Sequence, residues 1–136
     1  MTYARLATVL AAVAVCVGCD VDPAATQEPL QSALCVDEAY VVQQITGPSC
    51  AAAGCHDADE PKADLDLVSS GLAERLADRS SIHPLCRDRA IVVPGVPQAS
   101  FLMDKVLGSH GPCGDPMPEL SLEERRCLVT WIGSLP

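Results

Sequence analysis

The sequence predicts a small, mostly α-helical domain of about four short helices joined by long loops. The chain has 136 residues, which is enough for one domain. Apolar residues recur at helical spacing in several short segments, each bounded by a capping residue and by Gly or Pro. Beyond the first 18 residues only three aromatic side chains remain, Tyr40, Phe101 and Trp131. A core so poor in aromatic residues needs disulfides, a metal or a cofactor to stabilise it.

The first two expected helices lie in the first half of the domain. Asp37 can cap a helix over 37–46, which Gly47-Pro48 should end. A second helix should carry Leu72 and Leu76 and run to about Asp78, with Ser69 or Ser70 as its cap. An extended segment at 91–95 then breaks at Pro94-Gly95.

The last two expected helices follow this break. Pro97 should open the third, which contains Leu102 and Met103 and stops at Gly108. Ser121 and Glu124 have the spacing of a capping box and should start the fourth. That helix should end at Gly133, and its buried face consists of Cys127, Leu128, Trp131 and Ile132. The intervening loop, 108–118, is rich in Gly and Pro, and long loops in a small domain usually have a functional role.

The N-terminal segment has the pattern of an export signal. Arg5 precedes an apolar run over 6–17, which is too short to cross a bilayer and typical of a signal peptide. Gly18-Cys19 at its end resembles the cleavage site of bacterial lipoproteins. We therefore expect a lipoprotein signal peptide over 1–18, lipid on Cys19, a flexible tether over 19–33 and a folded domain over 34–136. A plain secretory signal is the alternative, and both place the chain in an oxidising compartment of the cell envelope or periplasm.

The charge of the chain is strongly acidic, with 18 Asp and Glu against 9 Lys and Arg. This balance argues against a nucleic-acid-binding surface. A cluster of carboxylates follows position 56: Asp57, Asp59, Glu60, Asp64 and Asp66. The cluster lacks the ordered spacing of a calcium loop, so we expect a solvated face that can steer a basic partner protein.

The cysteine count allows two interpretations. Eight cysteines are present, of which Cys16 leaves with the signal peptide and Cys19 takes lipid. Six then remain, at positions 35, 50, 55, 86, 113 and 127. In an exported domain six cysteines can form three disulfides, in any of fifteen pairings.

The second interpretation concerns the segment Cys50-Ala51-Ala52-Ala53-Gly54-Cys55-His56. Two cysteines, the second followed at once by histidine, form the pattern of covalent haem attachment. The thiols add to the two vinyl groups, and the histidine binds the iron. Here four small residues separate the cysteines in place of the usual two. Zinc is an alternative ligand, but no second Cys/His pair at finger spacing is present.

A second axial ligand is expected downstream. Met117 lies between two prolines in Gly114-Asp115-Pro116-Met117-Pro118, where limited backbone freedom would present its sulfur at little entropic cost. Met103 competes with it but has the helical spacing of a core residue. His83 and His110 are further candidates, for which a solvated surface position is the simpler interpretation.

The order of these motifs resembles a known family. Cys50-x4-Cys55-His56 is followed by Leu65-x-Leu67, Val93-Pro94-Gly95-x-Pro97-x-x-Ser100-x-Leu102, Met117-Pro118, Leu122 and Trp131-Ile132. Over residues 48–133 the chain resembles the cytochrome-c-like domain of the planctomycete type. The resemblance implies an all-α cytochrome c fold around one covalent haem c, attached to Cys50 and Cys55. It also implies His56 and Met117 as the axial ligands of the iron.

With Cys50 and Cys55 assigned to haem, four cysteines remain for two disulfides. Cys113 and Cys127 flank the Met117 loop and are expected to pair, which leaves Cys35 and Cys86 for each other. Tyr40 and Trp131 are candidates for a contact between the first and last helices.

The function expected on this basis is electron transfer, not enzymatic catalysis. A membrane-tethered c-type cytochrome would exchange single electrons with a redox partner protein in the cell envelope. The alternative from a different class is a haem-free, disulfide-stapled envelope lipoprotein that acts as a binding or structural module. A haem sensor or peroxidase with a displaceable sixth ligand is a third hypothesis.

Overall fold

The computed structural model describes residues 32–52 and 54–136, so the expected signal peptide, Cys19 and most of the tether lie outside the described residues. The elements in chain order are α2 (Glu38–Val41), the π-helix η1 (Val42–Cys50), the 3₁₀-helix η2 (Lys62–Asp64), α3 (Leu72–Leu76), the 3₁₀-helix η3 (Pro97–Ala99), α4 (Phe101–Leu107) and α5 (Leu122–Ser134). Over the described ranges the chain forms no sheet and pairs as strand only at two isolated bridges, Ala77 with Val92 and Ser80 with Ala90. The prediction of a helix-rich domain is confirmed.

The first helix starts as predicted and ends later. Asp37 caps it by accepting a hydrogen bond from the backbone N–H of Tyr40 at 3.0 Å. The expected stop at Gly47-Pro48 is wrong, because the chain continues through both residues as η1. A Cβ at position 47 would lie 2.7 Å from the carbonyl oxygen of Val42. Gly47 therefore does not end the helix here but permits the wide π turn that leads into Cys50.

The cap of α3 also differs from the prediction. Neither Ser69 nor Ser70 caps this helix, which begins after Gly71 and ends at Leu76. The carboxylate of Glu38 accepts hydrogen bonds from the N–H groups of Leu72 and Ala73 at 2.9 and 2.8 Å. A negative charge at this end also suits the helix dipole. The first turn of α3 is therefore stabilised by α2, not by its own flanking residues.

The later helices follow the predicted signals closely. Gly108 ends α4 in the left-handed conformation (φ 70°). Ser121 and Glu124 form the complete capping box of α5. The helix passes Gly133 by one residue, and its predicted inner face of Cys127, Leu128, Trp131 and Ile132 is buried. The first turn of the predicted third helix is instead the separate 3₁₀ turn η3.

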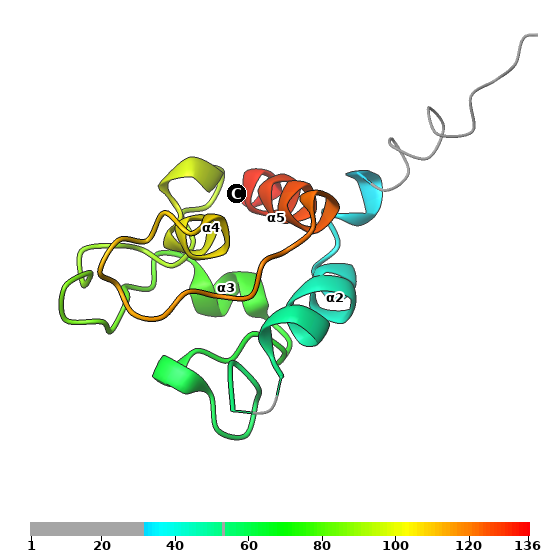
Figure 1. The fold of residues 1–136 in the computed structure, drawn as a ribbon. Helices are drawn as coiled ribbons and strands as arrows, with labels where there is room; N and C mark the ends of the chain where they lie inside the picture. The colour runs from blue at the N-terminus through cyan, green and yellow to red at the C-terminus, as the bar shows by residue number, and fades with distance from the viewer. Residues whose placement is uncertain (1–31, 53) are drawn as a thin grey trace, which may run out of the picture.

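The core forms around α5. In Figure 1, α2 and α4 lie on either side of α5 and both contact it. Trp131 is 1% exposed and belongs to the main apolar cluster, against which Tyr40 packs from α2. The helices α2 and α5 are thus in contact and both aromatic residues pack in or against the core, while a direct contact between Tyr40 and Trp131 stays a prediction. No helix in the described ranges is both long and apolar enough to cross a membrane.

Two disulfides form, but not between the expected partners. Cys35 pairs with Cys127, and Cys86 pairs with Cys113. The four predicted disulfide cysteines are therefore the right set, while the predicted pairs Cys113–Cys127 and Cys35–Cys86 are wrong. The first bond joins the start of the domain to α5. The second joins the loop before the extended segment to the loop that carries Met117.

Candidate functional site

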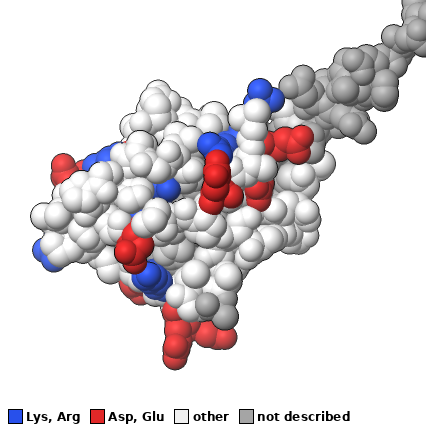
Figure 2. Space-filling model, in the orientation of Figure 1, with Lys and Arg blue, Asp and Glu red and all other residues white. Residues whose placement is uncertain are grey.

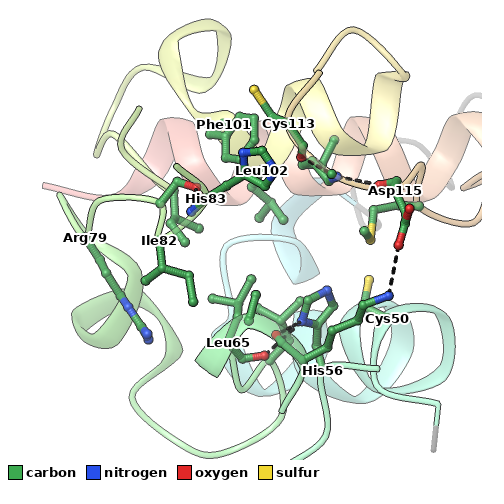
Figure 3. A pocket seen from close by; sticks show the side chains of 18 of the residues that line it. Cys50, His56, Leu65, Arg79, Ile82, His83, Phe101, Leu102, Cys113 and Asp115 are labelled. Atoms are coloured by element: carbon green, nitrogen blue, oxygen red, sulfur yellow. Dashed lines mark hydrogen bonds and ion pairs between the residues drawn. The ribbon is translucent and has the colours of Figure 1, made fainter. Parts of the chain in front are cut away.

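A cavity of about 420 Å³ lies between the loop that follows His56 and the α4 side of the molecule. Figure 3 shows His56, Leu65 and Cys50 on one side of the cavity and Phe101, Leu102 and Cys113 on the other. Its volume falls within the range of small-molecule and cofactor sites. Most of its lining is apolar, and the apolar lining residues include Leu65, Leu67, Ile82, Pro84, Ile91, Phe101, Leu102, Val106 and Met117.

His56 has the orientation of a metal ligand. It is 7% exposed, and its Nδ1 lies 3.1 Å from the carbonyl oxygens of Lys62 and Leu65. Because only a protonated Nδ1 can donate to a carbonyl, Nε2 carries the free lone pair. Figure 3 shows this second nitrogen directed into the cavity. A ligating histidine usually donates its other ring N–H in this way, which fixes the tautomer and the ring orientation.

The two carbonyls that hold His56 belong to a strained turn. Ala63 and Asp64 both adopt left-handed conformations, with φ of 59° and 55°. Such a conformation costs about 1–2 kcal/mol per residue other than glycine. The guanidinium of Arg79 stabilises the turn through the backbone oxygen and the carboxylate of Asp64, at 2.6 and 2.8 Å. These two conformations bend the backbone so that the carbonyls of Lys62 and Leu65 both reach the same side of the imidazole.

The protonation of His56 suits the same role. Burial lowers the pKa of His56 below its usual value, although the carbonyls of Leu65 and Lys62 oppose this effect. The positive charges of Lys105 and Lys62 lower it further. The imidazole is therefore neutral at pH 7, as a metal ligand must be.

Cys50 and Cys55 are the free thiols of the described residues, each half-buried. Cys50 lines the cavity from the end of η1, whereas Cys55 does not line it. Burial raises the pKa of Cys50 to about 11, with smaller contributions from Glu124 and Cys55. Cys50 is therefore a protonated thiol beside the cavity, and it is not consumed by a third disulfide.

The two methionines separate as expected. Met117 is half-buried and lines the same cavity as His56, in the loop between α4 and α5. Met103 is 4% exposed in the main apolar cluster and is absent from the cavity wall. The cavity therefore brings Met117 together with Cys50 and His56, which lie more than 60 residues earlier in the chain.

The other two histidines are not simple surface residues. His83 is half-buried and lines the cavity, and its Nδ1 accepts a hydrogen bond from the N–H of Leu85 at 3.3 Å. In the neutral form its Nε2 must then carry a proton, so it is arranged as a donor and not as a ligand. His110 is half-buried outside the cavity wall, and its Nδ1 has no partner.

Three cations on the cavity wall were not anticipated from the sequence: Lys62, Lys105 and Arg79. No local motif marks them, because their positions depend on how the loops fold. The rarity of lysine could have drawn attention to two of them, since Lys62 and Lys105 are the only two lysines of the chain. Both lysines lie at the same cavity of an otherwise acidic protein.

The acidic cluster after His56 has a partly structural role. Asp57 caps its own loop by accepting from the N–H groups of Gly54, Asp59 and Glu60, and these bonds keep its pKa below the usual value. Figure 2 shows acidic side chains projecting at the edge where this loop lies in Figure 1. Within the described ranges, no three His, Cys, Asp or Glu side chains are grouped to hold a metal ion.

We expect the buried His56 to make the stability of the haem-free protein pH-dependent. Its pKa is lower in the folded state, so the unfolded chain binds more protons as pH falls below about 6.5. The contribution of His56 to the free energy of unfolding should therefore be fully present above that pH and should decrease below it. Urea denaturation between pH 5 and 8 tests this. His56→Asn should flatten the profile, and an unchanged slope in this variant would assign the pH dependence to other groups.

The site fits an iron porphyrin better than a bare metal ion. One neutral imidazole and one thioether face an apolar cavity, which is too few protein ligands for a free cation but suits an iron whose other ligands come from a macrocycle. Cys50, a free thiol on the cavity wall, suits a covalent bond to such a ligand. No protein-family model, curated protein or solved structure matches the chain.

Proposed function

We propose that this protein is a membrane-tethered c-type cytochrome that binds one covalent haem and transfers single electrons in the cell envelope. One observation carries the proposal. The buried His56 donates from Nδ1 to two backbone carbonyls and directs Nε2 into an apolar cavity that Met117 and Cys50 also line.

Each residue of the site has a distinct task. Cys50 and Cys55 would attach the group, and His56 and Met117 would bind its iron. Haem, when bound, supplies a one-electron iron(III)/iron(II) couple. The apolar wall would shield the group from water, and binding of the iron by both His56 and Met117 would leave no ligand position open to a substrate. This arrangement favours an electron carrier over an enzyme.

The disulfides support the same assignment. Four of the six cysteines after Cys19 pair with one another, and the two that do not are those of the Cys50-x4-Cys55-His56 motif. A scaffold stapled only by disulfides would have a third bond available between these two thiols. We further propose that α2, α4 and α5 are the principal helices of a cytochrome c-like fold.

The proposed membrane attachment and redox partner rest on two features of the chain, the expected lipid on Cys19 and the acidic charge. Lipid on Cys19 would keep the domain at a membrane after export. The acidic face beside the His56 loop would steer a basic redox partner, and added salt would slow their encounter.

An absorption spectrum of the full chain tests the proposal. The chain is exported in a host with haem-ligation machinery, purified, and measured oxidised and then reduced. We expect the bands of a six-coordinate haem c and a mass increase of one haem that survives denaturation. Cys50→Ser combined with Cys55→Ser should leave no covalent haem, and His56→Asn should lose haem while His110→Asn retains it. A colourless protein with a Cys50–Cys55 disulfide would support the haem-free envelope module instead.

A further inference from the structure

Both lysines of the chain converge on the turn over 113–115, which precedes Met117. From α4, Lys105 donates its Nζ protons to the carbonyl oxygens of Cys113 and Asp115, at 3.1 and 2.5 Å. From the His56 loop, the Nζ of Lys62 lies 3.1 Å from the carboxylate of Asp115. Figure 3 shows these bonds as dashed lines on the Asp115 side of the cavity.

The two lysines contribute differently. The side chains of Lys62 and Asp115 are 58% and 78% exposed, and an ion pair so open to water is weak. Lys105 is half-buried, and its bonds reach main-chain atoms, so they fix the backbone itself. Hydrogen bonds from a charged donor are also stronger than neutral ones.

The turn is shaped around the ammonium of Lys105. Gly114 has φ of 87°, a left-handed conformation that favours glycine and lets the carbonyls on both sides of it face one point. A Cβ on Gly114 would lie 3.7 Å from the Nζ of Lys105. The turn thus closes directly over the lysine, with little space between them.

We propose that Lys105 is a positioning residue that fixes the sulfur of Met117 in the cavity. The inference rests on the proposed function, because it concerns the ligand that would face His56. Only Pro116 separates the anchored Asp115 from Met117, and the proline ring restricts the backbone between them. The disulfide Cys86–Cys113 secures the start of the same turn. The Lys105 bonds hold the carbonyls at both ends of the turn.

The test uses the exported, haem-loaded full chain in wild-type, Lys105→Met, Gly114→Ala, Lys62→Gln and Met117→Ala forms. All five should carry covalent haem. We expect Lys105→Met to lose the red charge-transfer band of methionine-ligated ferric haem, and its reduction potential should fall to that of Met117→Ala. Gly114→Ala should weaken the band and lower the potential in the same way. Lys62→Gln should keep the wild-type band, and its potential should fall less than that of Lys105→Met. An unchanged band and potential in Lys105→Met would overturn the inference.

A second readout separates this inference from the proposed function. Backbone order parameters from ¹⁵N relaxation are measured on the chain as isolated, reduced if it carries haem. In Lys105→Met, the values at Gly114, Asp115 and Met117 should fall below about 0.6, while Lys62→Gln should keep the values of about 0.85 that are typical of rigid backbone. A colourless protein that shows this loosening would refute the haem assignment and retain the role of Lys105. A haem-loaded protein in which Lys105→Met leaves these order parameters unchanged would support the haem assignment and refute the role of Lys105.

Discussion

Replacement of Cys35 and Cys127 together by alanine is expected to lower the free energy of unfolding by about 4–5 kcal/mol. The bond joins positions 92 residues apart and so closes almost the whole folded domain into one loop. Loop-closure entropy in the unfolded chain grows with this separation. Both cysteines are also buried, at 5% and 6% exposure, so the substitution leaves a small void against α5. Urea denaturation followed by far-UV circular dichroism measures the loss.

The matched control is the double alanine variant of Cys86 and Cys113. That bond spans only 27 residues, so its removal should cost about 1 kcal/mol less by the same reasoning. A larger loss from this control than from the Cys35–Cys127 variant would show that loop closure does not govern the contribution of the two bonds.

The second large effect is expected at Met117. Met117→Ala should retain covalent haem but lower its reduction potential, because a thioether ligand favours the reduced iron. The ferric spectrum should change at the same time. Since Met117 is half-buried in a loop, the stability of the fold should change little.

Met103→Ala is the matched control for this substitution. It removes the same side chain from the core beside α5, where truncation should cost about 2–5 kcal/mol. Its spectrum and potential should remain those of the wild type. If Met117→Ala left the spectrum unchanged, the sixth ligand would lie elsewhere, and a sensor or peroxidase with a displaceable ligand would become the better hypothesis.

Local signals predicted the helix ends that local bonds determine. The caps at Asp37 and Ser121 bond to N–H groups three residues on, so a short stretch of sequence contains all of the relevant atoms. The cap of α3 could not be found in this way, because its acceptor is Glu38, 34 residues before Leu72. Ser69 and Ser70 have the right chemistry, but the chain does not place them at the helix start.

The disulfide partners failed for a related reason. Cys113 and Cys127 are near each other in sequence, yet α5 directs Cys127 toward the start of the domain, where it meets Cys35. The pairing depends on which helices pack together, and the spacing of the cysteines in the sequence does not indicate this. The choice of Met117 over Met103 as a cavity residue was predictable, because a proline-flanked loop and an amphipathic helix differ in sequence.

For other residues that line the cavity, the sequence predicted the local structure but not the position at a cavity. Leu102 was expected in an apolar helical segment, but periodicity does not say whether such a segment meets another helix or an open space. His83 was assigned to the surface, since nothing near it in sequence indicates that its loop folds over the cavity.

The environment of Cys50 has a consequence for the maturation of the protein. A thiol reacts with disulfides through its thiolate, and raising the pKa of Cys50 from 9.0 to about 11 lowers the thiolate fraction at neutral pH roughly a hundredfold. In the folded domain, Cys50 should therefore react with disulfides more slowly than an exposed thiol. Burial in the fold thus shields this sulfur from thiol–disulfide exchange and favours its remaining a reduced thiol.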